Sequence, residues 1–309
     1  MRIATIDIGT NTILLLICDV IKKESAYSLN TILQKQYIPR IGRNTDSSRE
    51  INKQAFMDCK NILLEYKVLA HNYTCQNIIA CGTSVLRDAI NKYEFVEFQN
   101  KETGININIL SGSEEAEFTF LGALSNMKDN NNYTVIDIGG GSTEISFGKI
   151  NDLQFHKSIN IGAVRVTERF FKNLPPSKID LQNAINFIQS EIKDLSVTIF
   201  NNSKIIATAG TATTLAKYDQ NLVEFNFELI ENYNLKPSSI KKLVDNLKNL
   251  SLSEIQKIKS INIQRSDIIL AGALILQEIA KFFAIENIYV STKGLRYGIA
   301  LNVAKKTIF

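Results

Sequence analysis

The feature that most constrains this chain is a strand-turn-strand segment that occurs twice. Near the start, an apolar strand containing Asp7 leads into the turn Gly9-Thr-Asn-Thr12. The same order returns 130 positions later, where a strand containing Asp137 leads into Gly139-Gly-Gly-Ser-Thr143. Repetition of a segment at a fixed spacing indicates internal duplication. The sequence therefore predicts two similar domains.

A second pair of segments repeats at nearly the same spacing. Residues 78–84, Ile-Ile-Ala-Cys-Gly-Thr-Ser, match residues 205–211, Ile-Ile-Ala-Thr-Ala-Gly-Thr. Glycine-rich phosphate loops can resemble one another by chance, but here both order and spacing repeat, which favours duplication. A chain of 309 residues is also long enough for two domains.

The domain boundary is expected at the polar segment 128–132, Lys-Asp-Asn-Asn-Asn. This choice gives an N-terminal domain of residues 1–127 and a C-terminal domain of residues 128–309, whose last helix could pack back on the first domain. Between the repeated loops, apolar residues recur every three or four positions from Leu181 to Ile199, which predicts an amphipathic helix. Further helices are expected, the earlier ones alternating with strands, so the fold class is α/β. Their ranges are 54–69, 114–125, 240–250, 266–283 and 294–304.

Composition and short motifs exclude several classes of protein. Charged residues make up 21% and hydrophobic ones 45%, as in folded globular proteins. The longest apolar runs, 13–18 and 268–276, are too short to cross a bilayer, and no cleavage pattern follows the N-terminus. We therefore expect a cytoplasmic protein with no membrane partner.

The cysteines and histidines of this chain are not arranged as in disulfide frameworks or zinc sites. The four cysteines lie within the first 81 residues and form no C-x-x-C pair, and the two histidines have no neighbour at ligand spacing. We expect neither disulfides nor a zinc site. The net charge of +4 divides into −1 for residues 1–125 and +5 for residues 126–309. This small excess points to an anionic ligand only alongside a phosphate motif. We expect no nucleic-acid partner.

The strongest single element is Asp137-Ile-Gly-Gly-Gly-Ser-Thr-Glu144. Glycines tolerate positive φ and carry no Cβ, so the backbone N–H groups of Gly139, Gly140, Gly141 and Ser142 can gather round one phosphate. Asp137 and Glu144 place carboxylates beside this cradle, as Mg²⁺ requires when phosphate supplies its other oxygens. The alternative is a tight hairpin with incidental acids.

Two further loops offer small polar residues. The first turn presents Asn11 and Thr12, and the loop Ala209-Gly-Thr-Ala-Thr-Thr214 presents Gly210 and Thr211 at the start of a helix. Three such loops favour a phosphate site over three unrelated turns. Neither G-x-x-x-x-G-K-[ST] nor G-x-G-x-x-G is present, which excludes P-loop and Rossmann proteins at the motif level.

Together these segments resemble the exopolyphosphatase and guanosine pentaphosphate phosphohydrolase (Ppx/GppA) family, within the superfamily of acetate kinase, sugar kinases, heat-shock protein 70 and actin. The resemblance implies two ribonuclease H-like (actin-like ATPase) domains around a central cleft. The chain is similar to the short members, which lack an extra helical domain. The segments that carry the resemblance are 7–12, 82–91, 110–116, 137–144, 161–168, 207–211, 265–272 and 294–296.

The resemblance also implies roles for particular residues. It makes Glu115 the catalytic base, with Glu114 the second choice, and it makes Arg87 and Arg265 phosphate ligands. From the residues alone, Glu114 and Glu115 could equally be acids at a helix N-terminus capped by Ser111 or Ser113. Arg165 and Arg296 could be structural. This chain has Tyr297 where the family commonly has Glu, so a role that depends on a carboxylate at that position is not expected to carry over.

The function that follows is a Mg²⁺-dependent exopolyphosphatase, with Mn²⁺ as a possible substitute. It would release terminal phosphate from inorganic polyphosphate. Guanosine pentaphosphate (pppGpp) is the alternative substrate because its terminal phosphoanhydride is the same reacting group. A kinase or ATPase of the superfamily and a non-catalytic polyphosphate sensor are weaker alternatives. The resemblance further implies a homodimer.

Overall fold

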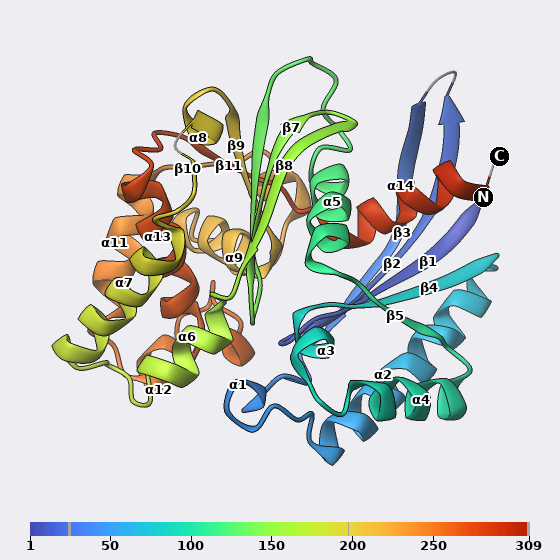
Figure 1. Ribbon diagram of the computed structural model, residues 1–309, viewed down its shortest axis with the longest axis horizontal. Helices are drawn as coiled ribbons and strands as arrows, with labels where there is room; N and C mark the ends of the chain where they lie inside the picture. The colour runs from blue at the N-terminus through green and yellow to red at the C-terminus, as the bar shows by residue number, and fades with distance from the viewer. Residues whose placement is uncertain (24–25, 197, 308–309) are drawn as a thin grey trace. The chain divides into compact units, whose positions relative to one another are not determined.

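The computed structural model describes residues 1–23, 26–196 and 198–307, and the chain forms two compact units (Figure 1). Unit 1 comprises Met1–Met127 and Lys293–Phe309, and unit 2 comprises Lys128–Thr292. The chain enters unit 2 at the polar segment where the sequence places the boundary. The sequence-based second domain, 128–309, is longer than unit 2, because the last helix packs its apolar side chains against the sheet of unit 1.

The sheet of unit 1 has the order β3-β2-β1-β4-β5. The first strand pairs antiparallel with the second and parallel with the fourth. A parallel partner requires a crossover connection, and helices supply it. The strands are β1 (Arg2–Ile8), β2 (Ile13–Lys23), β3 (Ala26–Tyr37), β4 (Asn77–Gly82) and β5 (Ile107–Ile109).

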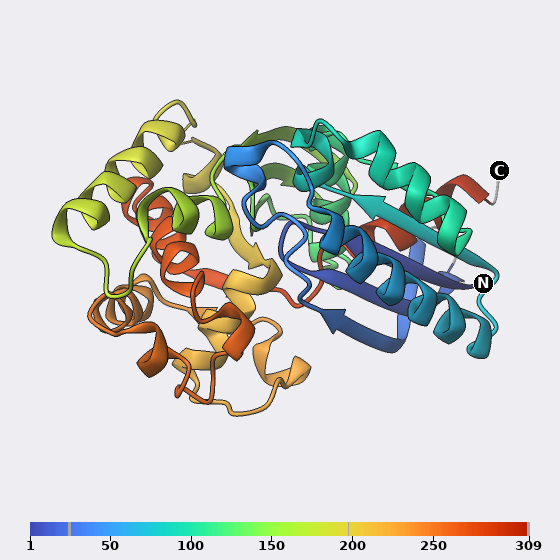
Figure 2. The same ribbon diagram turned by 90° about the horizontal axis from the view of Figure 1, so that it is seen from below.

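Helices cover both faces of this sheet (Figures 1 and 2). Side chains of a strand alternate between faces, so Ala4 and Ile6 join the core under α2, while Ile3 packs with Tyr297 and Ala300 of the last helix. Figures 1 and 2 show α2 and α4 side by side on one face. The helices are α1 (Thr45–Ser48), α2 (Lys53–Asn72), α3 (Ser84–Asp88), α4 (Lys92–Thr103), α5 (Gly112–Ala123) and α14 (Leu295–Thr307).

Unit 2 repeats the strand order of unit 1. Its sheet runs β10-β11-β9-β6-β7-β8, so β8-β7-β6-β9-β11 corresponds to β3-β2-β1-β4-β5, with β10 added at the edge. The directions repeat as well, since β6 is antiparallel to β7 and parallel to β9. Asp7 and Asp137 therefore occupy equivalent strands. The strands are β6 (Tyr133–Ile138), β7 (Thr143–Lys149), β8 (Asp152–Ile159), β9 (Lys204–Thr208), β10 (Asn234–Leu235) and β11 (Ile288–Val290).

The core of unit 2 surrounds one almost completely buried helix, α13. The apolar stripe from Leu181 predicts one helix as far as Ile199, but α7 ends at Ile192. Leu195 and Ile199 remain in the same core, so the stripe reports burial rather than one continuous helix. The helices are α6 (Ala163–Phe170), α7 (Lys178–Ile192), α8 (Thr198–Asn201), α9 (Ala209–Asp219), α10 (Phe227–Ile230), α11 (Pro237–Leu247), α12 (Leu252–Ile255), the 3₁₀ turn η1 (Ile263–Arg265) and α13 (Ile269–Phe282).

Within the described ranges, no helix is both long enough and apolar enough to cross a membrane. All four cysteines carry free thiols.

Candidate active site

In unit 1, the turn between β1 and β2 holds buried polar atoms that have no protein partner. The turn is closed by a hydrogen bond from Gly9 N to Thr12 O of 2.9 Å, and Thr10 Oγ1 lies 3.0 Å from Ser84 Oγ. Asn11 is only 6% exposed, yet neither polar atom of its side-chain amide is hydrogen-bonded, and neither is Asp7 Oδ1. Unpaired buried polar atoms are costly, and they mark places where a ligand or ion completes the bonding.

Asp7 is also electrostatically unusual. The pKa of this carboxyl group is raised to about 7, mainly by burial and also by the negative charge of Glu115, while the positive charge of Arg296 opposes the shift. Asp7 belongs to the first repeated segment, but the sequence-based metal pair included only its counterpart Asp137. The duplication itself is the signal that could have added Asp7 to the candidate residues.

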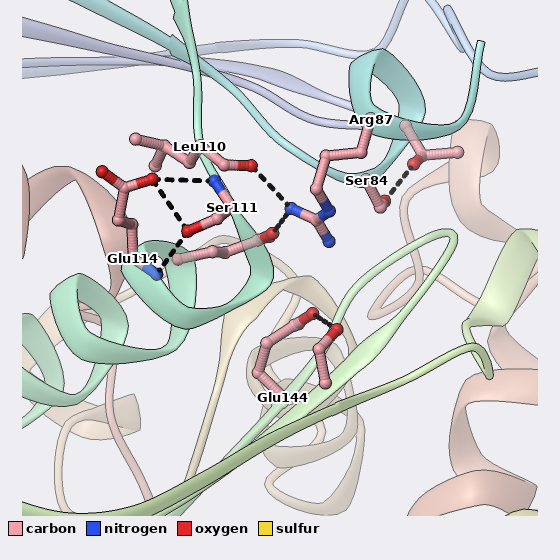
Figure 3. A network of polar contacts seen from close by, with 9 residues as sticks. Ser84, Arg87, Leu110, Ser111, Glu114 and Glu144 are labelled. Atoms are coloured by element: carbon pink, nitrogen blue, oxygen red, sulfur yellow. Dashed lines mark hydrogen bonds and ion pairs between the residues drawn. The ribbon is translucent and has the colours of Figure 1, made fainter.

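Arg87 and Glu115 form an ion pair in unit 1 (Figure 3). Arg87 lies in α3 and Glu115 in the first turn of α5; Arg87 Nη1 also donates to Leu110 O at 3.3 Å. The pairing brings together two residues that the sequence proposes separately, one as phosphate ligand and one as base. Glu115 is 7% exposed, so its carboxylate is largely withdrawn from bulk water.

Glu114 has different hydrogen-bond partners from Glu115. Its Oε2 accepts hydrogen bonds from Ser111 N at 2.9 Å and Ser111 Oγ at 2.8 Å, and Glu114 N donates to Ser111 Oγ at 3.2 Å. This is a capping box, which satisfies backbone donors at the start of α5. The helix-cap interpretation therefore holds for Glu114, whose bonds to Ser111 Figure 3 shows, while the carboxylate of Glu115 accepts from Arg87.

In unit 2, the triple-glycine loop is anchored by its carbonyl oxygens. A trans peptide points its N–H away from its C=O, so the N–H groups of Gly140, Gly141 and Ser142 point away from the donors on α6. None of these glycines uses a left-handed φ. Close packing requires a glycine on the other side of the contact, at Gly162, since a Cβ there would lie 2.4 Å from Gly140 O. The anchoring bonds are Ala163 N to Gly139 O at 2.9 Å, Val164 N to Gly140 O at 2.9 Å and Arg165 Nε to Gly141 O at 2.7 Å.

Asp137 and Glu144 are directly opposite one another on β6 and β7. Residues opposite in an antiparallel pair share a face of the sheet, so both carboxylates can reach one cation. Ser158 Oγ donates to Glu144 Oε1 at 2.7 Å and orients it. The described residues contain no cluster of three or more acidic, cysteine or histidine side chains suited to a metal. Two carboxylates are a donor set of the kind that Mg²⁺ uses, and a cation held by this pair would need its remaining ligands from water or phosphate.

The third predicted loop brings Arg265 to Gly210. A Cβ on Gly210 would lie 2.0 Å from Arg265 Nη1, so a larger residue there would displace the guanidinium. Burial lowers the pKa of Arg265 to about 10. Ala209 has φ 66°, a strained value for alanine, at the start of α9. Thr211 is 5% exposed and packs against Gly272.

Two other residues considered in the sequence are structural in unit 1. Arg296 is partly buried and donates to Leu15 O at 2.9 Å and to Gln34 Oε1 at 3.2 Å. Tyr297 is buried, and its hydroxyl lies 3.0 Å from Thr31 Oγ1. Tyr297 thus links α14 to β3.

Comparison with known proteins is consistent with this architecture. The profile of the Ppx/GppA phosphatase family matches residues 20–307. Exopolyphosphatase 2 of Mycobacterium tuberculosis is 26% identical, with 98% of each chain covered. A bifunctional 3-dehydroquinate synthase/phosphatase of Fusobacterium nucleatum is 33% identical over 96% of this chain, which spans only 46% of that protein's length. The crystal structure of the Aquifex aeolicus Ppx/GppA family member superposes with a TM-score of 0.83 at 28% identity, covering 100% of this chain and 99% of that one.

The strand order and these matches define an α/β protein of the actin-like ATPase fold. The chain belongs to the Ppx/GppA phosphatase family. It is accordingly a phosphoanhydride hydrolase, and the resemblance stated from the sequence is confirmed.

Proposed function

We propose that this protein is an exopolyphosphatase that releases terminal phosphate from inorganic polyphosphate with the help of Mg²⁺. The observation that carries the proposal is the buried carboxylate of Glu115 held by Arg87. The full-length similarity to an exopolyphosphatase supports polyphosphate as the substrate.

Glu115 would orient the attacking water and accept its proton, as a carboxylate with restricted water access can do. Arg87 would hold that carboxylate before substrate binds and offset negative charge on the phosphate during the reaction. In unit 2, the N–H groups of Gly140, Gly141 and Ser142 and the Arg265 guanidinium would supply donors for phosphate oxygens, whereas Gly139 N already donates to Ser142 O at 3.0 Å. Asp137 and Glu144 would hold Mg²⁺, which when bound would neutralise phosphate charge.

The test is phosphate release from polyphosphate and from pppGpp, each assayed with Mg²⁺, with Mn²⁺ and with EDTA. We expect release from polyphosphate that EDTA abolishes. Competition between the two substrates in one reaction gives the preference, and faster turnover of pppGpp would replace polyphosphate as the principal substrate. No release from either would refute the proposed activity.

The metal assignment has its own test. Asp137→Asn removes one anionic oxygen, so we expect the Mg²⁺ concentration for half-maximal activity to rise. An unchanged Mg²⁺ dependence would remove Asp137 from the metal site and leave the hydrolase proposal intact. The homodimer stays a prediction, which sedimentation of the whole chain would test.

A further inference from the structure

A short loop that the sequence analysis did not single out packs directly on the first polar turn of unit 1. Arg40 N donates to Asn11 O at 3.1 Å, and Gly42 N donates to Thr10 O at 2.8 Å. A Cβ on Gly42 would lie 2.3 Å from Thr10 Cγ2, so glycine is needed for this approach. Residues 40–45, which we name the basic loop, are therefore fixed against the turn.

The basic loop is rich in hydrogen-bond donors. Its sequence, Arg40-Ile-Gly-Arg-Asn-Thr45, contains two arginines and no acidic residue. The side chain of Arg43 is exposed, so it is accessible to a ligand. A guanidinium is suited to phosphate oxygens because it is planar, always charged and able to donate two parallel bonds.

The same loop contains a buried hydroxyl group, that of Thr45, which makes no hydrogen bond. Thr45 is 5% exposed, and its Oγ1 has no hydrogen-bond partner. Asn11, which is bonded through its backbone to Arg40, has the same property in its side-chain amide. A buried hydroxyl and a buried amide that make no hydrogen bond to the protein, on two segments joined by backbone bonds, are groups that a ligand can pair with.

The loop is also connected to the segment that carries Arg87. Arg49 N donates to Thr45 O at 2.9 Å, and Ile90 N donates to Arg49 O at 2.8 Å, just beyond the end of α3. The basic loop is thus held on one side by the Asp7–Thr12 turn and, through Arg49, on the other by the chain that follows Arg87. These backbone bonds give the loop a defined position within unit 1.

We propose that the basic loop is a second anion subsite, in which Arg43, Thr45 and Asn11 hold a non-reacting phosphate of a polyphosphate chain. The inference rests on the proposed function, because a second phosphate has to be present in the same substrate. Donors predominate among these groups, which favours phosphate oxygens over a metal ion. The subsite makes affinity depend on how many phosphates the substrate offers.

Two variants test the subsite. Arg43→Gln removes the exposed charge, and Thr45→Val removes the buried hydroxyl while keeping the shape of the side chain. Lys101→Gln is the matched control, since Lys101 is an exposed cation of the same unit. Binding of tripolyphosphate and long-chain polyphosphate is measured by calorimetry in EDTA, and KM and kcat are measured with Mg²⁺ for both substrates.

We expect Arg43→Gln and Thr45→Val to weaken polyphosphate binding about tenfold, as the loss of one hydrogen bond to a charged group implies, with kcat nearly unchanged. The control should bind normally. Thr45→Val should also melt no lower than the parent protein, because it removes an unsatisfied hydroxyl.

Unchanged affinity in both variants would overturn the subsite even if the enzyme hydrolyses polyphosphate. A fall in kcat without a change in affinity would also overturn it, because the loop would then only support the neighbouring turn. If the protein released no phosphate at all, the proposed activity would fail, while weaker calorimetric binding by the two variants would still support the anion subsite.

Discussion

At the scale of single residues, two adjacent glutamates show how one helical step separates roles. Successive residues of an α-helix point about 100° apart, so two neighbours cannot face the same partner. Glu114 turns back to the cap residue Ser111, and Glu115 turns to Arg87. The sequence leaves both residues open as cap or base on chemical grounds, and their hydrogen bonds assign the cap to Glu114.

The first prediction concerns this pair. Glu115→Gln should lower kcat by about 10²–10⁴-fold, the usual cost of losing a general base. Polyphosphate should bind at least as tightly, because the change removes a negative charge beside Arg87. Steady-state kinetics and calorimetry check the two parts.

Glu114→Gln is the matched control for Glu115→Gln. It should cost at most about 1 kcal/mol of unfolding free energy through the weakened capping box, with activity mostly retained. Loss of turnover in Glu114→Gln together with normal turnover in Glu115→Gln would reverse the assignment within the pair.

The second prediction concerns the pH dependence of stability at Asp7. The folded pKa of about 7 lies above the ordinary value of 3.8 for this carboxyl group, so between these pH values the folded state keeps a proton that the unfolded state has released. The contribution of Asp7 to the free energy of unfolding is therefore full at low pH. It declines as the pH rises from about 4 to about 7 and is lost above that range. Asp7→Asn cannot ionise and should remove this decline.

We expect Asp7→Asn to be more stable than the parent protein at pH 8, by on the order of a few kcal/mol, and similar to it at pH 4. Urea unfolding of both proteins in EDTA across this range provides the measurement. A constant difference between the two proteins at every pH would show that Asp7 keeps an ordinary pKa.

At the scale of secondary-structure elements, α5 depends on α14. The two helices meet through glycines: a Cβ on Gly122 would lie 2.1 Å from Gly294 O, and one on Gly298 would lie 1.7 Å from Phe118 O. Both distances are far below van der Waals contact. The position of the helix that carries Glu115 is thus set by a segment near the other end of the chain.

The third prediction follows from this helix contact. Gly298→Ala should destabilise the protein by about 1–3 kcal/mol, the usual cost of an overpacked contact, although alanine favours helices. Because α5 must shift, kcat should fall as well. Thermal unfolding and kinetics measure the effects, with Asn302→Ala on the same helix as a control. A variant as stable as the parent would show that the helices can separate at little cost.

At the scale of the whole molecule, the two units differ in how the chain builds them. Unit 2 is one continuous segment with its own core around α13, whereas unit 1 needs two segments from opposite ends of the chain. Without residues 293–309, the face of the unit 1 sheet that includes Ile3, Leu16 and Cys18 would lose its cover. Exposed apolar surface of this kind is unfavourable in water.

The fourth prediction is that residues 128–292 fold alone, whereas residues 1–127 do not. Circular dichroism and urea titration of each fragment should show a cooperative unfolding transition for residues 128–292 and none for residues 1–127. Joining residues 293–309 to residues 1–127 through a flexible linker should restore the transition. Cooperative folding of residues 1–127 by themselves would mean that α14 is dispensable for unit 1.

The sequence by itself determined the α/β class, the two repeated segments and the family. These depend on local order: apolar alternation marks strands, periodicity marks helices, and small residues mark the turns between them. The ends of individual helices were harder to predict from the sequence. Helix α7, for example, ends at Ile192, although the apolar residues continue at the same spacing. Burial, which the stripe reports, does not require one continuous helix.

Only the tertiary structure decided which distant residues meet. Arg87 and Glu115 are 28 positions apart, and Arg296 reaches Leu15 across 281 positions. The same holds for the basic loop, whose importance lies in its backbone bonds to Thr10 and Asn11 and in an unpaired hydroxyl on Thr45. Local patterns carry no information about such pairings, because they arise from how strands order in a sheet and how helices pack against it.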